Sequence, residues 1–434
     1  MTSLLVEPGA RLQGELRVPG DKSISHRAVM LGALADSPTR VEGFLRAADS
    51  LHTLAAFSSM GVPTRWQGDD VLLIEGVGMN GLHSSDDPLD VGNSGTAMRL
   101  MTGLLAGQTF ASVLTGDASL NARPMRRVAD PLREMGAAIH LQSDGTPPIR
   151  IEPVERLNAL HYTLPVASAQ VKSALLLAGM YAQGETVIHE PAPTRDHTER
   201  MLRAFGYAVA DTGNRKALQG GLRLSGQTVR VPADISSAAF FMVAASIAER
   251  ADIVLRDVGI NPTRDGVLTI LRLMGADIEV FNTRTWGAEP VADLRIRNAK
   301  LHGVEIPSAL VPLAIDEFPV LLVAAACASG VTRLYGAAEL RVKESDRIGA
   351  MADALQALGG AAEPHDDGMT VQGGPLRGGQ VRSRGDHRIG MAMAVAATVA
   401  AATVTVTDSD NIATSYPGFV EQAVAVGMRV QEVA

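Results

Sequence analysis

Residues 267–280 read VLTILRLMGADIEV, and this stretch contains the pattern that decides the fold. Leu268 and Leu271 are spaced so that they share one face of a helix, which predicts an amphipathic helix here. Gly275 follows, where a helix end needs a residue in the left-handed conformation. The alternating residues 277–280 then predict a half-buried strand.

The same order of helix, glycine and strand occurs six times in the chain. One copy would mean little in an α/β protein, but six copies at intervals of 68–84 residues form a repeat. The glycines that mark it are Gly61, Gly136, Gly206, Gly275, Gly359 and Gly427. A unit of this length can hold two helices and several strands, which is more than a solenoid repeat contains. The sequence therefore predicts an α/β protein with two pseudo-symmetric domains of three units each.

The length of 434 residues also favours two domains, because a single core stops growing at about 250–300 residues. Residues 230–247 contain a proline-bearing segment followed by an Ala-rich helix, and we expect the chain to cross from one domain to the other there. A second crossing between the domains is expected near residues 18–21. We therefore expect one discontinuous domain of residues 1–20 and 235–434, and another of residues 21–234. Two crossings form a hinge, and the cleft between the domains is the expected ligand site.

The composition argues against several classes of protein. Hydrophobic residues make up 46% of the chain and charged residues 20%, which is typical of a globular protein. The net charge of −8 argues against a nucleic-acid-binding surface. The single cysteine, Cys327, can form neither a disulfide within the chain nor a Cys-rich metal site. Residues 1–20 lack the apolar core of a signal peptide and no stretch reads as a bilayer span, so we expect a cytoplasmic protein without membrane contacts.

The motif GDKSISHR, residues 20–27, predicts an anion site at a helix start. The helix is expected to begin near Ser23 or Ser25, and the free N–H groups at such a start attract anions. Lys22 and Arg27 add two positive charges there, and Ser23 adds a hydroxyl group. A capped surface helix with solvated charges is the alternative interpretation.

Further motifs have the same form, although each could be a helix cap and nothing more. DVGNSGTAMRL, residues 90–100, predicts a tight turn with exposed backbone around Asn93 and Gly95. Arg123 is expected in a loop ahead of a helix that begins near Pro124. The segments LPVASAQVKSALLLAG and PTRDHTERM add Ser168, Gln170 and Arg195.

Charged residues also stand close before apolar helices in the last third of the chain. A charge run is usually a solvated helix face, but its recurrence at the start of buried-looking helices directs several side chains to one place. The motifs IDEFPVL, ELRVKESDRI and DHRIGMAM supply Asp316, Glu317, Lys343, Glu344, Asp346, Arg347, Asp386, His387 and Arg388.

Together the motifs gather a set of cations within an acidic protein. These cations are Lys22, Arg27, Arg123, Arg195, Lys343, Arg347 and Arg388. Their counterpart would be a small ligand set with several negative charges, which arginine binds through paired hydrogen bonds. The sequence has no zinc-ligand spacing, no dinucleotide-binding fingerprint and no Ser-His-Asp pattern, so we expect neither a metal nor a cofactor. The chemistry would then depend on acid–base groups and electrostatics.

These motifs, in this order, resemble those of the 5-enolpyruvylshikimate-3-phosphate (EPSP) synthases. The resemblance rests on GDKSISHR, GNSGTAMR, LRVKESDR and DHRI, and it extends over nearly the whole chain. It implies two domains, each of three βαβαββ units, and a monomer with no cofactor. It also implies an enzyme of the shikimate pathway, which leads through chorismate to the aromatic amino acids. By the same resemblance, this enzyme is the target of glyphosate.

The resemblance implies transfer of an enolpyruvyl group from phosphoenolpyruvate to the 5-hydroxyl of shikimate 3-phosphate. Asp316 would accept the hydroxyl proton, and either Glu344 or Lys22 would protonate the methylene carbon. Shikimate 3-phosphate would be bound by Lys22, Ser23, Arg27, Ser168, Ala169, Gln170, Arg195, Asp316 and Lys343. Phosphoenolpyruvate would be bound by Lys22, Asn93, Gly95, Arg123, Gln170, Arg347 and Arg388.

The sequence departs from one branch of that family at two positions. Thr414 stands where some members have Lys, and Ala169 stands where some have a second Ser. Both features resemble the branch with SAQ and IATS motifs, which includes glyphosate-tolerant members with Ala in place of Gly95. Because Gly95 is retained here, we expect glyphosate to inhibit the enzyme.

Three other functions compete with this interpretation. A UDP-N-acetylglucosamine enolpyruvyl transferase usually uses a loop cysteine, whereas Cys327 lies in an apolar run. An RNA-end-processing enzyme with His387 as nucleotidyl acceptor would need ATP and a basic RNA track, which the net charge of −8 opposes. A binding module for anionic metabolites would keep the arginines without needing the carboxylates Asp316 and Glu344.

Overall fold

The computed structural model describes residues 2–68 and 70–433 and divides the chain into two compact units. Unit 1 comprises Met1–Pro19, Pro232–Thr285 and Glu289–Ala434, and unit 2 comprises Gly20–Val231 and Trp286–Ala288. The chain thus passes from one unit to the other after Pro19 and again after Val231, with a short excursion at residues 286–288.

The described part of unit 2 contains three four-stranded sheets of one topology. In each sheet the first two strands are parallel, and the third and fourth are antiparallel to their neighbours. The first sheet has the order β16 (Thr228–Arg230), β3 (Thr39–Glu42), β5 (Val71–Ile74) and β4 (Thr64–Gln67). The second has the order β6 (Leu89–Asp90), β7 (Ser112–Thr115), β9 (Ile149–Glu152) and β8 (Ala138–His140). The third has the order β11 (His161–Thr163), β13 (Glu185–His189), β15 (Arg215–Gln219) and β14 (Ala210–Asp211), and β10 (Leu157–Asn158) pairs separately with β12 (Ala182–Gln183).

The sheets in the described part of unit 1 follow the same plan. One has the order β2 (Arg11–Leu16), β17 (Arg250–Gly259), β19 (Glu289–Arg297) and β18 (Asp277–Trp286). Another has the order β23 (Gly379–Arg382), β24 (Val404–Thr407), β1 (Ser3–Glu7) and β25 (Arg429–Val433). The third has the order β20 (Val331–Leu334), β22 (Gly368–Gln372) and β21 (Ala361–His365). A parallel bridge between Glu305 and Arg333 stands where a fourth strand would pair.

Each sheet is associated with one buried helix and one outer helix. The buried helices are α1 (Lys22–Leu34), α3 (Gly95–Leu105) and α6 (Ala169–Gly179) in unit 2, and α8 (Ile235–Ile247), α10 (Phe318–Cys327) and α12 (His387–Ala397) in unit 1. The outer helices are α2 (Ala48–Ser59), α5 (Arg126–Glu134), α7 (His197–Ala204), α9 (Gly266–Leu273), α11 (Arg347–Ala357) and α13 (Phe419–Ala425). Short helices are α4 (Ala118–Asn121), η1 (Ser308–Leu310), η2 (Ala338–Val342) and η3 (Asp410–Thr414). Strand, buried helix, strand, outer helix and two strands form the βαβαββ order, which confirms the predicted fold class.

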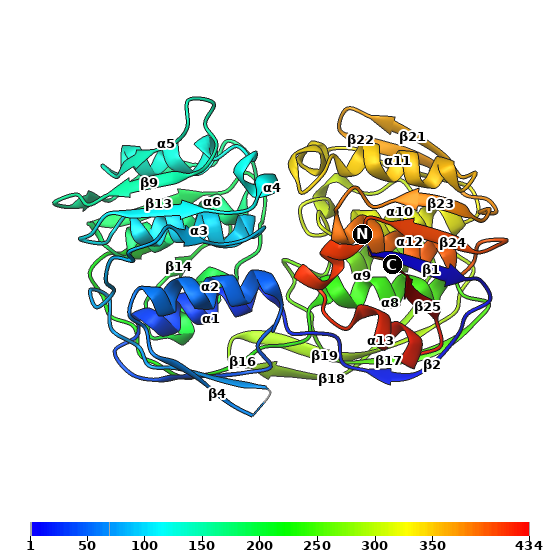
Figure 1. The fold of residues 1–434 in the computed structure, drawn as a ribbon, viewed down its shortest axis with the longest axis horizontal. Helices are drawn as coiled ribbons and strands as arrows, with labels where there is room; N and C mark the ends of the chain where they lie inside the picture. Colours follow the sequence, from blue (N-terminus) through cyan, green and yellow to red (C-terminus); the bar gives the residue numbers. More distant parts are fainter. Residues whose placement is uncertain (1, 69, 434) are drawn as a thin grey trace. The chain divides into compact units, whose positions relative to one another are not determined.

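The buried helices occupy the centre of each unit, and nearly all of their residues are buried. Helix α10 reads FPVLLVAAAC, and every residue in it except Cys327 is buried. It packs against α8 and α12, and in unit 2 helix α3 packs against α6 (Figure 1). A helix that is apolar all round is stable only when neighbours cover every face. Burial of each Leu or Val side chain contributes roughly 1.5–3 kcal/mol to that packing.

The six repeat glycines end the six outer helices, as the sequence predicts. All six adopt positive φ angles, from +78° at Gly359 to +105° at Gly427. Each lies two residues after the last residue of its helix, and a strand of the same sheet follows it. The left-handed conformation turns the chain from helix to strand, which is why glycine recurs at this place.

Two predicted helix starts lie within one or two residues of the observed ones. Helix α1 begins at Lys22, next to Ser23, because the Asp21 carboxylate accepts a hydrogen bond from the backbone N–H of Ile24 at 2.9 Å. Helix α5 begins at Arg126, two residues after Pro124. The N–H of Met125, which follows that proline, donates instead to the carbonyl of Gly145 at 2.9 Å.

We predict that alanine at two repeat glycines destabilises the protein by different amounts. Gly206→Ala should lower the free energy of unfolding by about 1–2 kcal/mol, because the left-handed backbone is strained for any residue with a Cβ. Gly427→Ala should cost more, because its Cβ would also lie 2.2 Å from the carbonyl oxygen of Arg11. Gly374→Ala is the control, since no atom lies within 4 Å of its added Cβ. In thermal unfolding, Gly427→Ala should have the lowest melting temperature, Gly206→Ala an intermediate one and Gly374→Ala the highest, and equal melting temperatures would contradict the assignment.

Candidate active site

The first turns of the three buried helices of unit 2 lie together. The His26 Nε2 atom on α1 is 3.2 Å from the hydroxyl of Ser94, which caps α3. The Gln170 side-chain N–H on α6 donates to the hydroxyl of Thr96 on α3 at 3.0 Å. The Arg27 guanidinium on α1 donates to the hydroxyl of Ser173 on α6 at 2.9 Å. Three helix N-termini, each carrying a partial positive charge, therefore meet at one end of the helical core.

Each of these helix starts has a side-chain cap. Asp21, Ser94 and Ser168 accept hydrogen bonds from the backbone N–H groups of Ile24, Ala97 and Val171, respectively. A cap satisfies one or two of the first four N–H groups of a helix, so the end as a whole keeps its attraction for an anion.

Arg27 is the most firmly held cation of this group. Its guanidinium donates to the Ser23 carbonyl at 2.8 Å, to the Thr198 hydroxyl at 2.7 Å and to Ser173. Only 4% of the residue is exposed, so its position is fixed by the protein before any ligand arrives. Arg195 lies half-buried in the segment that leads into α7.

Lys22, Asn93 and Arg123 are each held by a neighbouring side chain. The Lys22 ammonium lies 2.9 Å from the carboxylate of Asp49 on α2. The Arg123 guanidinium donates to the side-chain oxygen of Asn93 at 2.7 Å, and the Asn93 amide donates to Asp117 at the same distance. Asp49 thus orients Lys22, and Asp117 orients Arg123 through the amide of Asn93.

Gly95, the first residue of α3, allows two guanidinium groups to approach that helix start. A Cβ at this position would lie 2.7 Å from Arg99 and 3.1 Å from Arg123. Arg99 also donates to the side-chain oxygen of Gln170 at 3.1 Å. The sequence reasoning assigned no role to Arg99, although its place four residues after Gly95 puts both on one helix face.

In unit 1 the predicted residues surround Arg347, the first residue of α11. Only 1% of its side chain is exposed, and its guanidinium lies 2.9 Å from Asp386, 2.6 Å from Glu344 and 3.5 Å from Asp316. Burial alone would lower the pKa of Arg347, but these carboxylates outweigh burial and raise it. Burial alone would raise the pKa of Asp386, yet the charge of Arg347 brings that pKa below its usual value.

Asp316 is the centre of a second set of contacts in unit 1. Its carboxylate lies 3.4 Å from the Lys343 ammonium, and its backbone carbonyl accepts a hydrogen bond from Arg388 at 2.9 Å. Asp386 caps α12 by accepting the N–H of Arg388 and also binds Arg347, so it joins two of the predicted residues. The charged motif included Asp386, but its place as the shared partner of two arginines became visible only in the structure.

The predicted residues fall into two sets, each described within its own unit. Unit 2 contains Lys22, Ser23, Arg27, Asn93, Gly95, Arg123, Ser168, Ala169, Gln170 and Arg195. Unit 1 contains Asp316, Lys343, Glu344, Arg347 and Arg388. In both sets the residues belong to helix starts or to the loops that lead into them.

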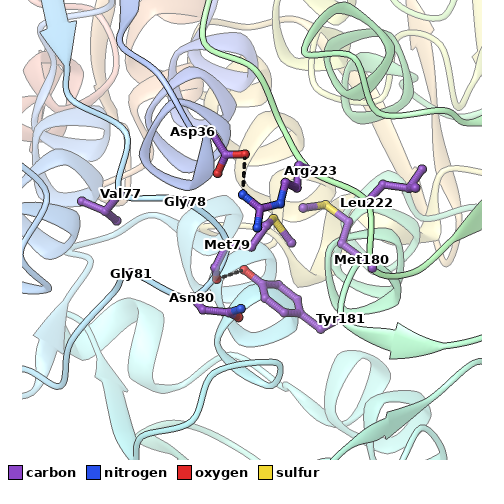
Figure 2. Close-up of a pocket in the computed structure, with 11 residues that line it drawn as sticks. Asp36, Val77, Gly78, Met79, Asn80, Gly81, Met180, Tyr181, Leu222 and Arg223 are labelled. Atoms are coloured by element: carbon purple, nitrogen blue, oxygen red, sulfur yellow. Dashed lines mark hydrogen bonds and ion pairs between the residues drawn. The ribbon is translucent and has the colours of Figure 1, made fainter.

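A pocket of unit 2 lies apart from these helix starts. Its volume is about 550 Å³, and its walls come from Asp36, residues 77–81, Met180, Tyr181 and residues 221–223 (Figure 2). The Tyr181 hydroxyl donates to the Met79 carbonyl at 3.0 Å, and Arg223 pairs with Asp36 at 3.2 Å. The pocket lies beyond the C-terminal ends of α1 and α6, and none of the predicted residues lines it.

The described residues show neither a candidate metal cluster nor a helix that could span a membrane. Residues 2–68 and 70–433 contain no group of three or more His, Cys, Asp or Glu side chains placed to hold a metal ion. Within the same ranges, no helix combines the length and the apolar character needed to cross a bilayer.

A family model described as EPSP synthase (3-phosphoshikimate 1-carboxyvinyltransferase) matches residues 6–423. The chain belongs to the EPSP synthase family. A 3-phosphoshikimate 1-carboxyvinyltransferase of Alkalilimnicola ehrlichii is 61% identical to it over 98% of this chain and 95% of its own length. One from Methylococcus capsulatus is 60% identical over 98% of this chain and 97% of its own length.

The solved structures agree with this family. An EPSP synthase of Acinetobacter baumannii matches all of this chain and all of its own with a TM-score of 0.90 and 50% identity. The enolpyruvyl transferase NikO of Streptomyces tendae matches with a TM-score of 0.82 at 20% identity, over 100% of this chain and 99% of its own, which shows a shared fold. The resemblance drawn from the motifs is confirmed.

His26 should make the protein less stable in acid. Burial, together with the charges of Lys22 and Arg27, lowers the pKa of His26 to about 3, whereas an unfolded chain has a His pKa near 6.5. The contribution of neutral His26 is therefore complete above pH 6.5 and is lost as the pH falls toward 3. At pH 5 the loss should be about 2 kcal/mol.

Denaturant unfolding of wild type and His26→Gln at pH 7 and pH 5 tests this expectation. The variant should lose about 2 kcal/mol less between the two pH values than wild type does. The same replacement at His140, which is exposed, is the matched control. Equal pH dependence of wild type and His26→Gln would show that the imidazole is not held neutral.

Proposed function

We propose that this chain transfers the enolpyruvyl group of phosphoenolpyruvate to the 5-hydroxyl of shikimate 3-phosphate through the two sets of residues described above. The products are EPSP and phosphate, and the route is addition followed by elimination. The observation that carries this function is membership of the 3-phosphoshikimate 1-carboxyvinyltransferase family over residues 6–423. The relatives at 55–61% identity bear the same name, so neither the UDP-N-acetylglucosamine enolpyruvyl transferase nor the RNA-end-processing alternative is favoured.

The arrangement in unit 2 supports binding of the acceptor's phosphate. The proposed ligands belong to the starts of α1 and α6 and to the segment that leads into α7. They are Lys22, Ser23, Arg27, Ser168, Ala169, Gln170 and Arg195, with Asp316 and Lys343 from unit 1. A phosphate at a helix start gains both the N–H groups of the first turn and the charge of nearby arginines.

Phosphoenolpyruvate carries a carboxylate and a phosphate, and its proposed ligands can match both groups. They are Lys22, Asn93, Gly95, Arg123 and Gln170 from unit 2, with Arg347 and Arg388 from unit 1. Arg123, Arg347 and Arg388 are all at least nine-tenths buried, so little side-chain entropy remains to be lost when they bind.

The contacts of the carboxylates in unit 1 support opposed roles for Asp316 and Glu344. The carboxylates of Asp316, Glu344 and Asp386 all pair with Arg347, and Asp316 also pairs with Lys343. An anionic substrate that binds beside these carboxylates favours a proton on one of them. Asp386 is held ionised, and Asp316 adjoins both cations, so we assign the proton to Glu344 and the base role to Asp316. Lys22 remains the other candidate for the proton donor.

Cys327 offers a physical reason against the UDP-N-acetylglucosamine reaction. It is the last residue of α10, about 15 Å along the helix from Asp316, which precedes that helix. Burial raises the pKa of its thiol to about 12, so almost none of it is the reactive thiolate.

A cytoplasmic location, a monomeric state and the absence of nucleic-acid partners stay predictions, as does the assignment of the two units as functional domains.

Release of phosphate from phosphoenolpyruvate by the purified protein tests the proposed reaction. We expect release without added metal or ATP, and only when shikimate 3-phosphate is present. Release with UDP-N-acetylglucosamine instead would assign the chain the other acceptor. A folded protein that is inactive with both acceptors would contradict the enolpyruvyl transfer.

Replacement of either carboxylate should lower turnover far more than it weakens binding. Asp316→Ala and Glu344→Ala should each lower kcat by roughly 10²–10⁴-fold, which is the usual worth of a general acid or base. Calorimetric binding of shikimate 3-phosphate should still be measurable in both variants. Asp353→Ala removes a carboxylate on α11 that is 62% exposed and serves as the control. Near-normal kcat in both site variants would support a binding module instead.

A further inference from the structure

Lys172 is a buried cation that the proposed reaction does not use. It is the fourth residue of α6, and none of its side chain is exposed. Its ammonium group lies 2.7 Å from Glu199 and 3.1 Å from Glu190, and it donates to the Thr194 carbonyl at 3.4 Å. Both glutamates are also buried, so no part of this cluster can contact a substrate directly.

The contacts of Lys172 enclose the segment that contains Arg195. Glu190 and Thr194 precede this arginine, and Glu199 follows it on α7. One ammonium group thus fixes the segment on both sides of Arg195 to the first turns of α6. That helix start includes Ser168, the cap, and Ala169 and Gln170, which follow it.

The same segment also holds Arg27. The Thr198 hydroxyl accepts a hydrogen bond from the Arg27 guanidinium at 2.7 Å and donates to Ser173 at 2.7 Å. Thr198 is the neighbour of Glu199, so a shift of Glu199 would be passed to Arg27. The two cations proposed for the acceptor's phosphate therefore depend on one buried network.

Stability by itself is a weak reason for this network. Removing a lysine and two glutamates from water costs several kcal/mol per ion, and an apolar replacement is often no less stable. Lys172 moreover lies near the N-terminus of α6, where the helix dipole disfavours a cation. A buried lysine whose desolvation costs this much free energy, and which touches no ligand, is better explained by the positions in which it holds the neighbouring residues.

We propose that Lys172 is a positioning residue for the acceptor's phosphate. It holds Arg195 and Arg27, through residues 190–199, at the distance from the α6 start that one phosphate group requires. This inference rests on the proposed function, which assigns both arginines to shikimate 3-phosphate.

The test variant is Lys172→Met with Glu199→Gln. The double replacement removes one charge of each sign, so Glu190 keeps Lys216 at 3.6 Å as its partner and the variant should fold. We expect the Kd for shikimate 3-phosphate to rise at least about tenfold, as is common when supporting residues of a site are lost. The KM for phosphoenolpyruvate and kcat at saturation should change less than about threefold. The proposed phosphoenolpyruvate ligands and the two proposed catalytic carboxylates lie outside residues 190–199.

The control is Lys216→Met with Asp211→Asn, which removes the neighbouring ion pair of 2.6 Å at the other end of the network. This variant should bind shikimate 3-phosphate as wild type does. If the folded Lys172→Met, Glu199→Gln variant binds shikimate 3-phosphate with the wild-type Kd, the inference is overturned, and a lowered melting temperature would then show that the network is structural only.

Arg195→Ala separates this inference from the proposed function. A wild-type Kd in that single variant would remove Arg195 from the proposed binding set and would overturn the inference with it. If Arg195→Ala does weaken binding, adding it to the Lys172→Met, Glu199→Gln background should cost little more, because Lys172 acts through Arg195. If the losses of binding free energy from Arg195→Ala and from the Lys172→Met, Glu199→Gln pair add fully, the inference is overturned and the proposed function stays intact.

Discussion

The structure depends on the need to satisfy the first N–H groups of helices that are buried on every side. Among residues 2–68 and 70–433, six such helices form the centres of the two units, and a helix start has four N–H groups without partners inside the helix. Side chains such as Asp21, Ser94 and Asp386 satisfy some of these groups. The helix starts nevertheless keep a positive end, and the proposed substrate-binding residues gather there because of it.

Acidic side chains of this chain hold the cations of these sites in place. The net charge is −8, yet the cations proposed to bind the substrates are held by carboxylates: Lys22 by Asp49 and Arg347 by Asp386. Such pairs fix the direction of a lysine or arginine before a ligand arrives, which lowers the entropy lost on binding. Local pairing of this kind allows an acidic protein to recognise substrates that are themselves anions.

Much of the fold and of the candidate site followed from local signals in the sequence. Gly275 and its five counterparts predicted the repeat because a positive φ angle after a helix is a local requirement that glycine meets best. The motif around Lys22 predicted a helix start because caps and charges act over a few residues. Arg99 was missed because its partner Gln170 lies 71 residues further along the chain. No local pattern reports such a contact.

The sequence by itself determined the repeat, the order of its elements and the residues that stand at the buried helix starts. Periodicity and glycine placement act within about one helical turn, so a linear reading is enough to find them. Only the tertiary structure decided that β1 and β2 complete sheets formed by residues near the other end of the chain and in its middle. It also decided that Lys172 joins Glu190 to Glu199. Those contacts depend on which surfaces meet after the helices are buried, and that choice is made by packing over the whole unit.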